Sequence, residues 1–179
     1  MRHIREYRED WIGGFAEITG FLEPFLPDGC RVHHIGSTSV PGMPAKDIVD
    51  VDVECPQGSM SRVIERLAAA GYEHRGDRGV PTREAFHLRD GSSAAHLRPH
   101  HLYACESDSP ELRRHLAFRD YLAAHPRRAR WLARQKRCAD AASPTREAYI
   151  AGKAAAYEKI LADAVPWAFG RCPAGASNR

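Results

Sequence analysis

Apolar residues along the chain recur first at helical spacing and then at strand spacing. From Tyr7 to Leu26 they stand three or four positions apart, which predicts a helix that Pro24 and Pro27 close. Two short runs follow and both predict strands, the apolar-flanked Val32–Ile35 and Ile48–Val53, which is rich in β-branched residues. The first third of the chain is therefore expected to be one helix followed by two strands.

The rest of the chain predicts one more helix, a group of strands and then three consecutive helices. A stripe formed by Val63, Ile64 and Leu67 predicts a helix from about Ser59 to Ala70, with Gly71 as its C-cap. Further strands are expected at 72–76, 85–90 and 101–106, and helices at about 109–125, 127–141 and 143–165, the last ended by Pro166. Strands gathered early and helices late predict an α+β fold with one mixed β-sheet, an N-terminal helix and a C-terminal helical bundle.

A chain of 179 residues with an ordinary globular composition is most simply one domain. We expect this domain to cover residues 1–168, with a sheet core over about 30–107, a helical part over about 109–165 and a flexible tail over 169–179. Because no run of 18 apolar residues exists and the charged N-terminus has no apolar signal core, a cytoplasmic protein without membrane contact is expected. The five cysteines include no C-x-x-C pair, which favours reduced thiols over a zinc site.

Two acidic residues stand in the second predicted strand. Because successive strand side chains point to opposite faces, Asp50 and Asp52 share one face, and the buried face is left to Val49, Val51 and Val53. Neighbouring carboxylates repel unless a counter-ion compensates them, and Mg²⁺ or Mn²⁺ with oxygen ligands is the usual one. Asp50 and Asp52 are predicted to be metal ligands and catalytic residues. The alternative is a pair of solvent-facing acids on a half-exposed strand.

A turn rich in glycine and hydroxyl groups precedes this strand, formed by Gly36, Ser37, Thr38 and Ser39. The backbone N–H groups and hydroxyls of such a turn can contact phosphate oxygens. Lys46, between the turn and the strand, would neutralise phosphate charge. A purely structural turn and an exposed loop lysine are the alternatives. A Gly-Ser turn followed by a D-x-D strand predicts metal-assisted phosphoryl or nucleotidyl transfer.

The stretch HIGSTSVPGMPAKDIVDVDV resembles the GrpB family, within the nucleotidyltransferase superfamily that includes DNA polymerase β. The later segments HLRPHHLYACE, HLAFRDYLAAHP and REAYIAGKAAAYEKIL resemble the same family in the same order, so the resemblance covers about residues 7–161. A related domain is appended to some dephospho-coenzyme A kinases. The resemblance implies a nucleotidyltransferase-like core and a nucleotide substrate.

Members of that superfamily usually carry a third carboxylate on a neighbouring strand, which here corresponds to His101–Cys105. Alternation places His101, Tyr103 and Cys105 on one face, so no third acid is expected at the site. We predict that His101 instead ligates the metal or acts as general base, with a structural histidine as the alternative. Glu106 would supply a carboxylate only in a different strand register.

Four residues elsewhere in the chain are candidates for nucleotide binding. Arg83 and Arg98 precede the last two strands, where guanidinium groups could hold triphosphate oxygens. Tyr149 and Lys153 lie in a segment that resembles the family and share a helix face, four residues apart. The lysine could clamp the β- or γ-phosphate. A surface position is the alternative for the two arginines and the lysine.

Together these features predict metal-dependent nucleotidyl transfer from ATP or another NTP to a small-molecule acceptor, or adenylation of a carboxylate followed by ligation. A nucleotide-binding module with weak catalysis is the alternative, because the third acid is missing. A nucleic-acid partner is less favoured. The stretch Arg113–Arg137 holds nine Arg or Lys residues and one acid, but it also has an ordinary apolar side and no nucleic-acid motif.

Overall fold

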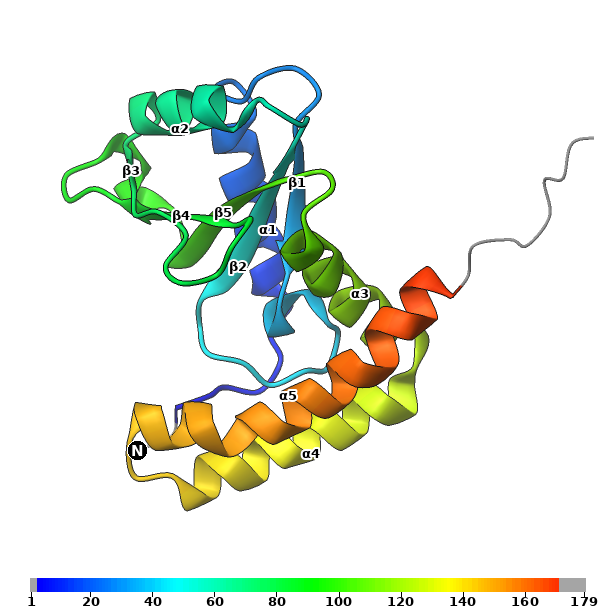
Figure 1. Cartoon of the computed structure of the whole chain (residues 1–179). Helices are drawn as coiled ribbons and strands as arrows, with labels where there is room; N and C mark the ends of the chain where they lie inside the picture. Colours follow the sequence, from blue (N-terminus) through cyan, green and yellow to red (C-terminus); the bar gives the residue numbers. More distant parts are fainter. Residues whose placement is uncertain (1–2, 171–179) are drawn as a thin grey trace, which may run out of the picture.

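One mixed five-stranded sheet organises the molecule in this computed structural model, which describes residues 3–170 (Figure 1). Its strands are β1 (Arg31–Ile35), β2 (Val49–Cys55), β3 (Tyr72–His74), β4 (Glu84–Leu88) and β5 (His100–Glu106), in the order β1-β2-β5-β4-β3. The α-helices within those residues are α1 (Asp10–Leu22), α2 (Met60–Ala69), α3 (Pro110–Ala124), α4 (Pro126–Ala142) and α5 (Arg146–Phe169). The predicted α+β class is confirmed.

The pairing of β2 with β5 decides which side chains meet at the centre of the sheet. These two strands run parallel, whereas the other strand pairs are antiparallel. Their register places Asp50 opposite His101 and Asp52 opposite Tyr103. On the other side of β2, Ile35 of β1 pairs with Asp50. One sheet face therefore gathers the acidic residues of β2 and the aromatic residues of β5.

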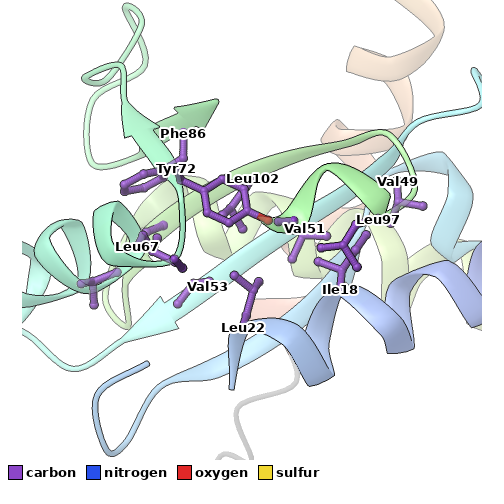
Figure 2. Close-up of a cluster of buried hydrophobic side chains, with 14 of the residues drawn as sticks. Ile18, Leu22, Val49, Val51, Val53, Leu67, Tyr72, Phe86, Leu97 and Leu102 are labelled. Atoms are coloured by element: carbon purple, nitrogen blue, oxygen red, sulfur yellow. The ribbon is translucent and has the colours of Figure 1, made fainter. Parts of the chain in front are cut away.

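The opposite face of the sheet is the hydrophobic core. Val49, Val51 and Val53 are fully buried there, as predicted, together with Leu102 of β5 (Figure 2). Helices α1 and α2 cover this face through the residues Ile18, Leu22, Val63 and Leu67. Because each buried aliphatic side chain stabilises the fold by roughly 1.5–3 kcal/mol, this face anchors β2 firmly.

The C-terminal helices form a second apolar cluster of their own. Val40 and Met43, from the loop that precedes β2, pack into it with residues such as Phe118, Leu132 and Ile160. Helix α3 also contacts β1 and β5 directly. The loop and α3 thereby fix the helices against the acidic face of the sheet. Among the described residues, no helix is long and apolar enough to cross a membrane.

The structure moves several predicted boundaries. The first helix spans Asp10–Leu22 rather than 7–26, and the connection between β4 and β5 contains a 3₁₀ turn at Ser93–His96. The predicted end of the last helix at Pro166 is wrong, because α5 continues to Phe169. Trp167 packs against Tyr121 of α3 and against His125, which lies between α3 and α4, and this contact holds the last turn in place although proline lacks an N–H. The predicted flexible tail from residue 169 lies, beyond residue 170, outside the described residues.

Arg98 ties the start of α1 to the segment that leads into β2. Its guanidinium donates to Asp47 Oδ1 at 2.6 Å and to Asp10 Oδ2 at 2.7 Å. Asp47 Oδ1 also accepts from the indole N–H of Trp11 at 2.9 Å. Because Trp11 is fully buried, this polar network fixes α1 on the core.

We therefore expect Arg98→Ala to destabilise the protein by about 2 kcal/mol, because hydrogen bonds to charged groups contribute about that much each and Asp47 is left partly unpaired. Urea unfolding followed by tryptophan fluorescence measures the loss. The exposed Arg134→Ala is the matched control and should change stability by less than about 0.5 kcal/mol. Equal effects of the two substitutions would contradict the structural role of Arg98.

Candidate functional site

Two neighbouring cavities meet at Asp50, on the sheet face opposite the core. The larger, about 300 Å³, lies between the sheet and helices α3 and α5, and its lining includes Gly36, Arg83, Tyr103, His115, Phe118 and Tyr157. The smaller, about 140 Å³, is lined by Ser37, Lys46, His101, Lys136, Tyr149, Lys153 and Tyr157, among others. Asp50 and Tyr157 line both cavities. The geometry thus brings together the predicted residues Gly36, Ser37, Lys46, Asp50, Arg83, His101, Tyr149 and Lys153.

Asp50 and His101 form a hydrogen-bonded pair across β2 and β5. His101 Nδ1 lies 2.8 Å from Asp50 Oδ1, so an N–H at that nitrogen donates to the carboxylate and leaves Nε2 as the basic nitrogen. The His101 side chain is 43% exposed, which gives Nε2 access to a ligand. The arrangement orients an imidazole for proton transfer in the way that carboxylate–histidine pairs do in enzymes.

Gly36 leaves the second oxygen of Asp50 room. A Cβ placed on Gly36 would lie 2.5 Å from Asp50 Oδ2, closer than atoms tolerate. Gly36 also adopts a φ of +70°, a conformation that residues with a side chain rarely take. The glycine of the predicted turn is therefore required both by the backbone and by the carboxylate beside it.

Asp52 is fully buried and belongs to a chain of charged groups that leads into α3. Its Oδ2 accepts from His115 Nδ1 at 2.7 Å, and His115 Nε2 lies 3.2 Å from Glu111 Oε1. Burial alone would lower the pKa of His115, but the hydrogen bonds to Asp52 and Glu111 outweigh it and raise the pKa to about 9. The same hydrogen bond from His115 lowers the pKa of Glu111. Near neutral pH, His115 is thus a buried imidazolium between two carboxylates.

This arrangement changes the expectations for the acidic residues. The alternative of two solvent-facing acids is wrong for Asp52, whose side chain has no exposed surface. Glu106 is not the missing third acid, because it pairs with Cys55 at the far end of β5 and accepts from the backbone N–H of Gly58. The additional carboxylate near Asp52 is Glu111 on α3, which acts through His115.

The turn before β2 uses its hydroxyls in three different ways. Ser37 Oγ accepts from Lys136 Nζ at 2.7 Å and shares a hydrogen bond with the hydroxyl of Tyr157. Thr38, by contrast, is buried and bonds to His34, and Ser39 donates to the carbonyl of Gly36. The structure therefore brings Ser37 to the cavities, whereas the hydroxyls of Thr38 and Ser39 are occupied in holding the turn.

Three ammonium groups gather in the smaller cavity. Lys46, Lys136 and Lys153 line it together, and Asp50 is the one carboxylate of its lining. Burial lowers the pKa of all three ammonium groups, and positively charged neighbours lower it further. Lys153 Nζ lies 4.5 Å from the ring centroid of Tyr157 and 5.5 Å from that of Tyr149. An anion would relieve the repulsion among these cations, so the cavity suits a phosphate chain.

The two predicted arginines separate in the structure. Arg83 lies over the ring of Tyr103, with its Cζ 4.3 Å from the ring centroid, and its Nε is buried without a hydrogen-bond partner among the described residues. Arg83 is therefore a cation of the larger cavity. Arg98 lines neither cavity and is held by Asp47 and Asp10, so the structure does not bring it to the site.

Four side chains of the site were not among the predicted candidates, namely Glu111, His115, Lys136 and Tyr157. Helical spacing contained a signal for each of them. Glu111 and His115 are four residues apart, Lys136 follows the buried Leu132 by four, and Tyr157 follows Lys153 by four. Tyr149, Lys153 and Tyr157 thus form one stripe of cavity-lining side chains along α5.

A divalent cation fits this site only together with a ligand. In the described part of the chain, no three His, Cys, Asp or Glu side chains converge to form a protein cage for a metal ion. Asp52 Oδ1, however, is a buried carboxylate oxygen without a partner, and Asp50 Oδ2 lies beside the glycine turn. Mg²⁺ is typically bound through one or two carboxylates plus substrate phosphates and water, which agrees with this donor set.

The chain matches one protein-family model and is similar in sequence to several known proteins. The GrpB family model, described as GrpB protein, matches residues 2–163. The UPF0157 protein YqkA of Bacillus subtilis (strain 168) is 36% identical over 174 residues, which make up 96% of this chain and 49% of that protein. This chain thus spans about half the length of that relative.

Two solved structures share the fold. The conserved protein GrpB from Enterococcus faecalis superposes with a TM-score of 0.76 at 30% identity, over 93% of this chain and 99% of that one. A mutant of the Cid1 poly(U) polymerase bound to MgATP gives a TM-score of 0.50 at 11% identity, over 74% of this chain and 45% of that one. The second likeness shows a nucleotidyltransferase-like fold.

The raised pKa of His115 predicts how stability depends on pH. Because the folded-state pKa of about 9 lies above the unfolded value of about 6.5, the stabilisation is complete below pH 6.5 and is lost as the pH rises to 9. We expect the free energy of unfolding to fall by on the order of 2 kcal/mol across this window, as measured by urea unfolding in EDTA.

His115→Gln should be less stable at pH 6.5 and should lose this pH dependence, since the buried Asp52 then loses its cation and Glu111 keeps only its ion pair with Arg114. His87→Gln changes an exposed histidine and serves as the control, with the wild-type slope retained. An unchanged slope in His115→Gln would show that another group titrates.

Proposed function

The chain belongs to the GrpB family, and we propose that it transfers the nucleotide of an NTP, with ATP as the first candidate, to a small-molecule acceptor. The observation that carries this proposal is the smaller cavity, where three lysines face a single carboxylate, Asp50. Such a cavity compensates the charge of a triphosphate better than that of a neutral ligand. The nucleotidyltransferase-like fold agrees with this assignment.

In this proposal the triphosphate occupies the smaller cavity and the nucleoside occupies the larger one. Lys46, Lys136 and Lys153 contact the phosphate oxygens, with the hydroxyl of Ser37 beside them. The larger cavity offers the apolar surface of Phe118 and Leu161 for a base or sugar. Since Asp50 and Tyr157 line both cavities, the α-phosphate would lie beside Asp50, where the two spaces meet.

The reaction step follows from the pair formed by Asp50 and His101. A hydroxyl or carboxylate oxygen of the acceptor attacks the α-phosphorus, a new P–O bond forms, and the bond to the β-phosphate oxygen breaks. Pyrophosphate leaves with the electron pair, and the lysines stabilise its developing charge. If the acceptor is a hydroxyl, His101 Nε2 takes its proton, while Nδ1 stays hydrogen-bonded to Asp50.

A Mg²⁺ or Mn²⁺ ion would be held by Asp50 and by the unpartnered Oδ1 of Asp52 together with phosphate oxygens, and would supply Lewis-acid stabilisation of the phosphates. With a carboxylate acceptor the product is an acyl adenylate, which a second nucleophile can convert into an amide or an ester. In that variant no proton has to leave the acceptor, so His101 serves to orient Asp50.

One observation favours a second function, that of a nucleotide-binding module with weak catalysis. In the β2–β5 register the position beside Asp52 on β5 holds Tyr103 rather than a carboxylate. Burial raises the pKa of the Tyr103 phenol, which therefore stays neutral and cannot bind a metal as an anion near pH 7. In that case the chain binds the nucleotide tightly and releases little pyrophosphate.

Calorimetric titration of ATP with and without Mg²⁺ tests the proposed function. We expect binding by the wild type to strengthen with Mg²⁺, and Asp50→Asn to lose this metal-dependent gain while it retains the lysine contacts. Asp90→Asn, at an exposed position, makes the same chemical change away from the cavities and should bind as the wild type does. Absence of NTP binding by the wild type would refute the proposal, and binding without pyrophosphate release in an acceptor screen would favour the second function.

Lys136 provides a test that separates a functional from a structural role. Because burial lowers its pKa, the charged lysine opposes folding, and this destabilisation grows as the pH falls below the unfolded value of about 10.5. Lys136→Met should therefore raise stability at pH 7 by about 1 kcal/mol, or roughly 2–4 °C in Tm. It should also weaken ATP binding at least about tenfold, since a buried contact to phosphate is lost.

Lys159→Met is the matched control, because Lys159 is exposed on α5 over the ring of Trp131. It should leave both Tm and ATP binding close to the wild type. A strong loss of stability in Lys136→Met, with ATP binding unchanged, would mean that this lysine holds the turn at Ser37 and has no part in nucleotide binding.

A further inference from the structure

A third cavity opens beside the site, over β4 and β5. It has a volume of about 490 Å³ and is lined by Arg75, Arg78, Ala85, Phe86, His87, His101 and Tyr103. It shares His101 with the smaller cavity of the site, which the three lysines line. It shares Tyr103 with the cavity of about 300 Å³ between the sheet and helices α3 and α5. The imidazole of the Asp50–His101 pair therefore borders a space that the proposed nucleotide position leaves free.

The position of this third cavity follows from the sheet register. Ala85 of β4 pairs with Tyr103 of β5, so the two share the face that carries Asp50. Alanine is small, which leaves room beside the Tyr103 ring. In Figure 1, β3 and β4 lie at the side of the sheet away from α3, α4 and α5.

The charges of the third cavity are positive. Arg75 and Arg78 line it, and its lining contains no carboxylate. Arg75 forms an exposed ion pair with Glu73 at 3.1 Å, of the kind that contributes little energy and is easily exchanged. Arg78 forms no ion pair within residues 3–170. Both guanidinium groups can thus turn to an incoming anion at small cost.

The loop that presents Arg78 is held in an uncommon conformation. Arg78 and Thr82 have φ angles of +53° and +66°, which cost on the order of 1 kcal/mol each in residues other than glycine. The loop is fastened at one end, because Ser109 donates its hydroxyl to the carbonyl of Thr82 and also lies within hydrogen-bond distance of the Thr82 hydroxyl. The rest of the fold therefore maintains the position of the loop beside the cavity.

We propose that the third cavity binds the acceptor, and that the acceptor is a small molecule with a carboxylate or phosphate group held by Arg75 and Arg78. This inference rests on the proposed nucleotidyl transfer and adds the class of acceptor to it. The anionic group lies between the two arginines, and the reacting oxygen points to His101 and the α-phosphorus. The acceptor oxygen gains the nucleotidyl group, pyrophosphate leaves, and the proton of an attacking hydroxyl passes to His101 Nε2.

The test follows backbone amide shifts of the ¹⁵N-labelled full chain, saturated with α,β-methylene ATP and Mg²⁺ so that the lysine-lined cavity is filled. Succinate and glycerol 3-phosphate are titrated as anionic probes, and succinamide and glycerol as their neutral counterparts. We expect at least one anion to shift the amides of residues 75–88 and 101–103, and the neutral compounds to leave them unchanged. The two anions distinguish a carboxylate from a phosphate.

In the double variant Arg75→Gln/Arg78→Gln the affinity for the anion should fall at least tenfold, while binding of the ATP analogue stays as in the wild type. Arg130→Gln/Arg134→Gln removes the same charge from exposed positions of α4 and should retain anion binding. The proposal is overturned if neither anion shifts these amides, or if the Arg75/Arg78 variant binds the anion as the wild type does. If the wild type does not bind the analogue, the proposed function fails, and titration of the free protein still decides whether the arginines bind anions.

Discussion

Charged groups of both signs lie buried between the sheet and the C-terminal helices, and the site depends on how each of them is compensated. Burying an ion without a partner costs several kcal/mol. Asp52 is compensated by the imidazolium of His115, whereas Lys136 contacts a serine hydroxyl and the ring of Tyr157 and feels the charge of Asp50 without an ion pair. The charge of Asp52 is thus neutralised within the protein, whereas the three lysines of the smaller cavity face the single carboxylate of Asp50. This asymmetry is the physical reason to assign an anionic ligand to the structure.

The elements of the fold were accessible from the sequence because their signals are local. Valines that alternate with acids in β2 predict both the buried face and the position of Asp50, and the structure agrees. Helical spacing and the prolines located α3 and α4 to within a few residues. The boundary at Pro166 failed because a contact with α3, distant in sequence, outweighs the local effect of a proline.

The candidate site was accessible in part, for the same reason. Motif residues on the turn and on β2 were identified, whereas Lys136 was hidden in an arginine-rich stretch, where a single buried lysine looks like its exposed neighbours. His115 was missed because its partner Asp52 is 63 residues away. Arg98 shows the opposite error. A basic residue ahead of a strand suggests phosphate binding, but its role depends on Asp10 and Asp47, which no local pattern connects to it.

Several contacts that build the site join distant parts of the chain. Asp50 and His101 are 51 residues apart, Ser37 and Lys136 are 99 apart, and Ser37 and Tyr157 are 120 apart. Contacts with such long loops form late in folding, after local helices and hairpins. A partly folded or truncated chain can therefore contain the sheet, with Asp50 beside His101, and still lack the contacts of Ser37 with Lys136 and Tyr157. A normal secondary-structure content therefore does not show that this protein has folded completely, whereas the contacts of Ser37 with the C-terminal helices do.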